Sequence, residues 1–206
     1  MTIPIFLASA WGLTIYFERL WLLNAENVIP PRLKEKVNAL ADEGKIQEAL
    51  VLAESSETPY GKVMREILEK SGRAYPYLKE TAEDAGAAQV AFLERRMGSL
   101  ETVIAISPLM GLLGTVLGMI TVFQAVAEKG VGSPMDMASG IWEALLSTAF
   151  GLSVAIIALV GHRQLSGRID GFVAALEKEA LNLVETLDVL TAPTSPTPET
   201  SENEAK

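Results

Sequence analysis

The 206-residue sequence has no cysteine, one histidine, and fewer basic than acidic residues. The absence of cysteine excludes disulfide bonds and thiolate metal sites, and it leaves the cellular compartment open. Lys and Arg total 17 against 26 Asp and Glu, so the chain lacks the basic face that nucleic-acid binding requires. No nucleic-acid partner is therefore expected.

Motifs of enzyme chemistry are also missing. The sequence contains no phosphate-binding loop, no nucleophile elbow and no metal-ligand spacing. We therefore expect no cofactor, no metal and no catalytic residue. The single histidine, His162, stands beside Arg163 at the end of an apolar run, where an interfacial or capping role is the favoured interpretation. These absences predict a protein that is not an enzyme.

Charge is missing from long stretches, and these stretches are the most informative feature of the chain. Crossing the hydrocarbon core of a bilayer takes about 20 apolar residues. Uncharged runs cover 102–127 and 144–161, and a further apolar block runs from Ile3 past Glu18 and Arg19 to residue 23. That first block lacks the positively charged start of a signal peptide, so we interpret it as an uncleaved membrane span.

The resulting fold class is an all-α, polytopic membrane protein with three transmembrane helices, the second and third extended into a cytoplasmic helical bundle. With the N-terminus outside, only Lys129 of the 17 Lys and Arg falls outside, which agrees with the positive-inside rule. The expected segments are a first transmembrane helix (1–23), a cytoplasmic helical segment (24–101), a second transmembrane helix (102–127), a short periplasmic loop (128–137), a third transmembrane helix (138–161), a cytoplasmic helix (162–190) and a disordered tail (191–206).

The cytoplasmic segment reads as short helices. Apolar residues at helical spacing predict a helical hairpin after Pro30 and Pro31, with a break near Gly44 and an end at Pro59. The stretch 79–97 is rich in Ala and Glu, and we expect it to run directly into the second span as one rod. The tail has almost no apolar side chain and cannot offset the entropy of ordering.

Small and hydroxyl residues recur in the second span. Ser107, Gly111 and Thr115 are spaced four apart and share one helical face. Gly114 and Gly118 form a pair of small residues, which in lipid lets helix backbones approach closely. Packing is the favoured interpretation for the glycines. Thr115 has two open interpretations, a bond to the carbonyl four residues earlier and a role in transport.

The third span carries a matching stripe. Glu143, Ser147 and Gly151 are spaced four apart, and Thr148 borders them. Two spans that both present hydroxyls and glycines are what a narrow polar conduit needs. Glu143 is either a group on an ion route or a carboxylate at the outer interface that stabilises assembly. In the second span Pro108 predicts a bend, either structural or a hinge.

The stretches "AISPLMGLLGTVLGMITVF" (105–123) and "GIWEALLSTAFGLSVAI" (140–156) resemble the two signature helices of the ExbB/TolQ/MotA proton-channel family. The resemblance covers roughly residues 3–190, and three spans rather than four favour the ExbB/TolQ branch. By position, Thr115 and Thr148 match the family's pore-facing threonines, Glu143 matches the glutamate at the head of the third span, and Pro108 matches the proline of the second.

The resemblance implies a proton-channel subunit of an energy-transducing motor in the bacterial inner membrane, with a periplasmic N-terminus. It also implies a homo-pentamer around a dimer of a single-span partner similar to ExbD or TolR, which supplies the titrating aspartate. The complex would use the proton-motive force to do work on a TonB- or TolA-like protein. The long periplasmic N-terminal extension of some members is not expected here, because Met1 and Thr2 precede the first span directly.

One observation from the residues alone agrees with the partner that the resemblance implies. The central parts of the second and third spans contain hydroxyls but no Asp or Glu that could load and release a proton. The sequence therefore predicts an incomplete channel that needs a carboxyl group from another chain. ExbB-like nutrient import, TolQ-like envelope maintenance and a non-conducting membrane scaffold remain alternatives, as do protons and sodium ions.

Overall fold

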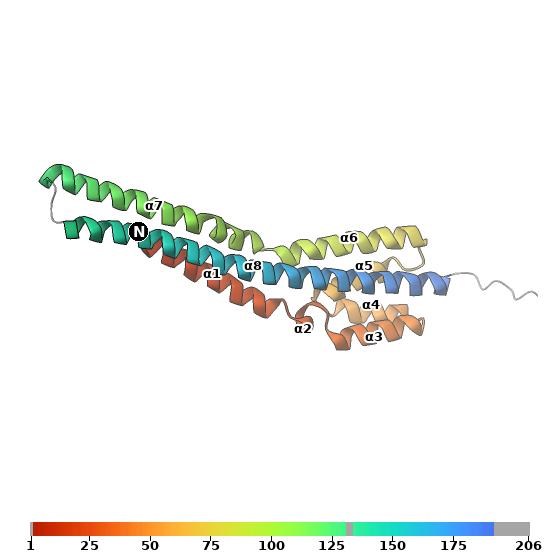
Figure 1. The fold of residues 1–206 in the computed structure, drawn as a ribbon. Helices are drawn as coiled ribbons and strands as arrows, with labels where there is room; N and C mark the ends of the chain where they lie inside the picture. The colour runs from red at the N-terminus through yellow and green to blue at the C-terminus, as the bar shows by residue number, and fades with distance from the viewer. Residues whose placement is uncertain (1, 131–133, 192–206) are drawn as a thin grey trace, which may run out of the picture. The chain divides into compact units, whose positions relative to one another are not determined.

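The computed structural model describes residues 2–130 and 134–191, and every regular element in these ranges is an α-helix (Figure 1). The all-α prediction is therefore confirmed for the described residues. The tail at 192–206 and the middle of the expected periplasmic loop lie outside them. The helices are α1 (Thr2–Leu22), α2 (Ala25–Val28), α3 (Pro31–Asp42), α4 (Ile46–Glu54), α5 (Pro59–Glu69), α6 (Tyr75–Glu94), α7 (Met97–Lys129) and α8 (Pro134–Thr191).

The chain forms two compact units. The first comprises residues up to 28 together with 88–174, and the second comprises 29–87 together with residues from 175 onwards. The first unit contains α1, α7 and most of α8, and the second contains α3, α4 and α5.

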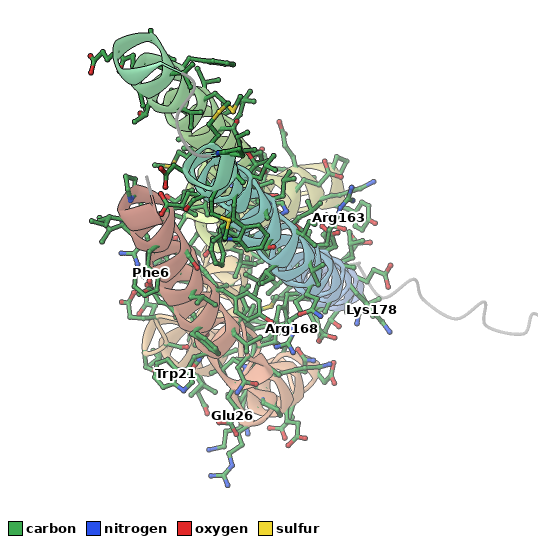
Figure 2. The ribbon with its side chains drawn as sticks, turned by 60° about the vertical axis from the view of Figure 1, so that its left-hand side comes forward. Phe6, Trp21, Glu26, Arg163, Arg168 and Lys178 are labelled. Carbon is green, nitrogen blue, oxygen red and sulfur yellow. The ribbon has the colours of Figure 1, made fainter. Side chains whose placement is uncertain are left out.

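Among the described residues, two helices are long and apolar enough to cross a membrane. They are α7, over Met97–Glu128, and α8, over Pro134–Thr191. Large apolar side chains also project from α1, where Phe6 is 75% and Trp21 79% exposed (Figure 2). Such exposure suits contact with lipid better than contact with water. That α1 forms a third span remains a proposal.

Close backbone contact joins α7 and α8 in the first unit. A Cβ atom added at Gly151 would lie 2.5 Å from the carbonyl oxygen of Ser107 and 3.0 Å from the Cα of Gly111. A Cβ atom added at Gly118 would lie 2.7 Å from the Cβ of Ala144. Residue numbers rise along one helix as they fall along the other, so the two helices run antiparallel. Only glycine allows this approach at Gly151.

The expected rod from 79–97 into the second span is wrong. Helix α6 ends at Glu94 and α7 begins at Met97. Between them Arg96 adopts φ of 77°, a left-handed conformation that few non-glycine residues take and that ends a helix. The long α8 does continue past residue 161 as one helix, as the sequence predicts.

Contacts from α1 explain the break. The buried guanidinium of Arg19 donates to the carbonyl oxygens of Leu93 and Arg95, at the point where α6 leaves its last carbonyls without helical partners. The side chain of Arg96 is paired with the Glu18 carboxylate. Sequence periodicity could not show this break, because the contacts come from a helix more than 70 residues away.

The second unit confirms the predicted hairpin. Helices α3 and α4 pack together and are joined at Gly44, which adopts φ of 73°. A polar group lies inside this unit: the carboxylate of Glu179 accepts from Lys34 Nζ at 2.8 Å and from the Asn38 amide at 3.2 Å. Burial raises the pKa of the neighbouring Tyr60 phenol, which therefore stays neutral and hydrogen-bonded to Asn38.

Gly151→Ala tests the contact between α7 and α8. Overpacking of a tight contact destabilises by about 1–3 kcal/mol, so we expect thermal unfolding in detergent at a lower temperature than for the wild type. Gly167→Ala is the matched control on the same helix, since an added Cβ there meets nothing within 4 Å. The control should be neutral or stabilising, by up to about 1 kcal/mol. Equal shifts for both variants would contradict the close contact.

Candidate functional site

Four of the hydroxyl side chains on α7 and α8 are those that the sequence predicts to line an ion route. Ser107 is fully buried and Ser147 is 6% exposed, and both are covered by the helix pair. Thr115 and Thr148 are half-buried. The hydroxyls thus run from the contact between the two helices, at Ser107 and Ser147, to its edge, at Thr115 and Thr148.

Every one of these hydroxyls donates its proton to a backbone carbonyl. A serine or threonine hydroxyl has one proton and two lone pairs, so a hydroxyl whose proton is engaged can only accept further hydrogen bonds. The row on α7 and α8 therefore holds acceptors, of which only those of the half-buried Thr115 and Thr148 are open to a further group. The four bonds are Ser107 to Val103 (2.7 Å), Thr115 to Leu112 (2.7 Å), Ser147 to Glu143 (3.2 Å) and Thr148 to Gly111 (2.9 Å).

Thr148 makes the one bond of the four that crosses between helices. Its hydroxyl reaches the carbonyl of Gly111, which precedes Thr115 by one helical turn. The structure thereby brings Thr148 to the α7 face that carries Ser107, Gly111 and Thr115. The sequence predicts that face from spacing, and the resemblance implies that Thr148 faces the same pore, but spacing alone does not indicate its hydrogen bond to Gly111. Thr115 bonds the carbonyl three residues earlier, not four as in the simpler interpretation.

The remaining predicted residues lie on the same two helices. The Glu143 side chain is exposed on α8, one turn before Ser147. Gly114 is buried on α7, and α7 continues through Pro108 without a break. No group of three His, Asp or Glu side chains suited to hold a metal ion occurs in residues 2–130 and 134–191.

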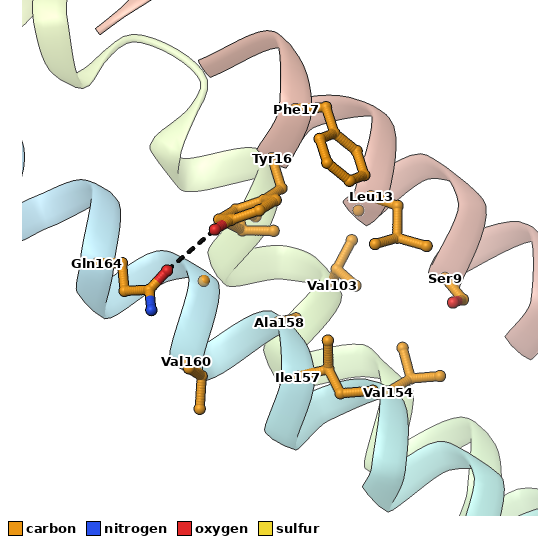
Figure 3. A pocket seen from close by; sticks show the side chains of 13 residues that line it. Ser9, Leu13, Tyr16, Phe17, Val103, Val154, Ile157, Ala158, Val160 and Gln164 are labelled. Atoms are coloured by element: carbon orange, nitrogen blue, oxygen red, sulfur yellow. Dashed lines mark hydrogen bonds between the residues drawn. The ribbon is translucent and has the colours of Figure 1, made fainter. Parts of the chain in front are cut away.

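A mostly apolar pocket of about 270 Å³ lies between α1, α7 and α8 (Figure 3). At one end the hydroxyl of Tyr16 donates to Gln164 Oε1 at 2.9 Å. Gly161 makes room for the ring, since a Cβ there would lie 2.8 Å from Tyr16. Sequence reasoning missed this contact, although a glycine at the end of an apolar run was an available signal. The lining includes no charged side chain.

The comparisons of the chain with a family model and with known proteins agree with one another. The family model described as the MotA/TolQ/ExbB proton channel family matches residues 32–178. A putative biopolymer transport protein ExbB homolog of Methanothermobacter thermautotrophicus is 31% identical over 76% of this chain and 56% of its own length. The chain thus spans little more than half of that relative.

Two further relatives carry the names of the two branches. The biopolymer transport protein exbB1 of Vibrio cholerae is 31% identical over 89% of this chain and 82% of its own length. The Tol-Pal system protein TolQ of Haemophilus influenzae is 36% identical over 47% of this chain and 41% of its own length. With two membrane-length apolar helices and a family model that covers more than half of its length, the chain belongs to the MotA/TolQ/ExbB proton channel family of membrane proteins.

Proposed function

We propose that the chain is a proton-conducting subunit of an ExbB/TolQ-like, energy-transducing complex, in which α7 and α8 line part of the ion route. The observation that carries this proposal is the row of hydroxyls whose protons are all engaged by backbone carbonyls. Such a row accepts hydrogen bonds and donates none. Its natural ligand is a group that carries a proton.

A carboxyl group fits this row in only one of its two states. A protonated carboxylic acid has an O–H that can donate to Thr115 or Thr148, whereas a carboxylate has only acceptors. A carboxylate would also lose hydration in the membrane without gaining a partner, which is costly. The hydroxyls therefore favour the proton-loaded acid. Release of the proton would drive the carboxylate toward water.

The acid must come from a second chain. The runs 102–127 and 144–161 contain no Asp or Glu, so α7 and α8 hold no titrating group in their central parts. We infer a single-span partner of the ExbD or TolR kind, present as a dimer inside a homo-pentamer of this chain. In this proposal the chain crosses the inner membrane three times, at 1–23, 102–127 and 138–161, with its N-terminus in the periplasm and 24–101 and 162–190 in the cytoplasm.

The process that the proton flow would drive depends on the branch of the family to which the chain belongs. An ExbB-like role would pass it to a TonB-like protein for transport across the outer membrane. A TolQ-like role would pass it to a TolA-like protein for envelope maintenance, and the Haemophilus relative favours keeping this second candidate. We also propose that the exposed Glu143, on the outer side in this topology, attracts cations to the entrance of the route.

Thr115→Val with Thr148→Val tests the hydroxyl row. Valine keeps the shape of threonine but cannot accept a hydrogen bond, so proton flux in vesicles that contain the chain and its single-span partner should fall about tenfold or more. The control is Thr121→Val, which removes an exposed hydroxyl from another position of α7. Subunit stoichiometry, measured by native mass spectrometry, should stay unchanged. Wild-type flux in the double variant would refute the assignment.

Glu143→Gln separates the two roles of that residue. If Glu143 attracts cations, the variant assembles normally and its flux falls, most clearly at low salt where charge is least screened. Glu128→Gln, at the end of α7, is a control for loss of an exposed carboxylate and should conduct as the wild type does. A variant that loses its subunit stoichiometry would make Glu143 an assembly residue instead.

A further inference from the structure

A second, polar pocket lies in the first unit where the two uncharged runs end. It has a volume of about 240 Å³, and it is bordered by the end of α6, the first turns of α7 and the part of α8 that follows the third predicted span. We call it the inner pocket. Its polar lining side chains are Glu94, Glu101, His162, Ser166 and Asp170.

Two titratable groups meet in the inner pocket. His162 Nε2 lies 3.2 Å from Glu101 Oε1, and the histidine side chain is 17% exposed. Glu101 directly precedes the uncharged run 102–127, and His162 directly follows the uncharged run 144–161. The pair therefore consists of the first titratable groups that a proton would meet on α7 and on α8 when it leaves the apolar part of either helix.

The charges around His162 come from three helices. Carboxylates face the pocket from α6 (Glu94), α7 (Glu101) and α8 (Asp170). The cations next to the lining residues in the chain are Arg163, which is exposed and follows His162 on α8, and Arg95 and Arg96 of the junction between α6 and α7. At that junction Arg96 is paired with Glu18, and the buried Arg19 of α1 donates to backbone carbonyls. An imidazole among carboxylates in an open polar pocket has both a proton source and proton acceptors within reach.

We propose that His162, held by Glu101, is a proton-binding site that exchanges protons between the inner end of the ion route and water. In each exchange a hydronium ion gives one proton to the imidazole and becomes water. The imidazolium, paired with the Glu101 carboxylate, then returns that proton to another water molecule. This inference rests on the proposed function, because it needs protons to travel along α7 and α8. A purely structural pair would clamp the helices without exchanging protons.

Proton flux at different pH values separates exchange from clamping. Vesicles containing the full chain and its single-span partner are held at a fixed potassium diffusion potential, and the pH on the pocket's side is varied from about 5 to 8. We expect His162→Gln to lower the flux about tenfold and to remove its pH dependence in this range, since glutamine cannot bind a proton. Arg163→Gln, which changes the adjacent charge, should keep the wild-type profile. A wild-type profile in His162→Gln would overturn the proposal.

The wild-type chain allows a second measurement that needs no variant. His162 is the only histidine of this chain, so nitrogen-15 labelling of histidine in this chain alone, assembled with an unlabelled partner and purified with a tag that lacks histidine, reports on one imidazole position. If the site exchanges protons, the imidazole should bind and release a proton as the pH is varied from about 5 to 8. An imidazole that keeps one state across this range would overturn the proposal.

The two proposals fail in different ways. If the double threonine variant blocks flux and His162→Gln leaves the pH profile unchanged, only the exchange site is wrong. If the double threonine variant conducts like the wild type, the proposed ion route along α7 and α8 is wrong.

Discussion

The first unit depends on the close approach of α7 and α8 at Gly111 and Gly151. With any larger side chain at Gly151 the backbones would separate, because the Ser107 carbonyl would lie 2.5 Å from the added carbon. This approach is also what brings the Thr148 hydroxyl within 2.9 Å of the Gly111 carbonyl. Packing and chemistry are therefore not separate here. The contact that holds the helices together also decides which way the hydroxyl proton points.

In the proposed complex, engagement of the hydroxyl protons would give the helix pair a preference for one form of a partner's acid. Acceptors stabilise a protonated acid in a medium where a bare carboxylate is costly. The chain then needs no charge of its own along 102–127 and 144–161, and its titratable groups stand at the ends of those runs. Glu143 directly precedes the run 144–161, and the Glu101–His162 pair lies at the opposite end of the two runs. This arrangement agrees with an ion route in which another chain supplies the central titratable group.

Much of this could be predicted from the sequence, because composition and spacing act over short distances. The absence of charge marks α7 and α8 as membrane helices, and the four-residue spacing of Ser107, Gly111 and Thr115 indicates one face. The break at Arg96 and the contact between Thr148 and Gly111 could not be predicted. Both depend on partners distant in sequence, Arg19 in the first case and the facing helix in the second. Sequence periodicity carries no information on either.

The central claim is that this chain supplies hydrogen-bond acceptors and that a second chain supplies the acid. Voltage-driven proton flux into vesicles tests it most directly, with the chain alone, with its single-span partner, and with a partner whose intramembrane aspartate is changed to asparagine. The account predicts flux above the background of empty vesicles only for the chain with the unaltered partner. Flux through the chain alone at the rate of the complex would contradict it.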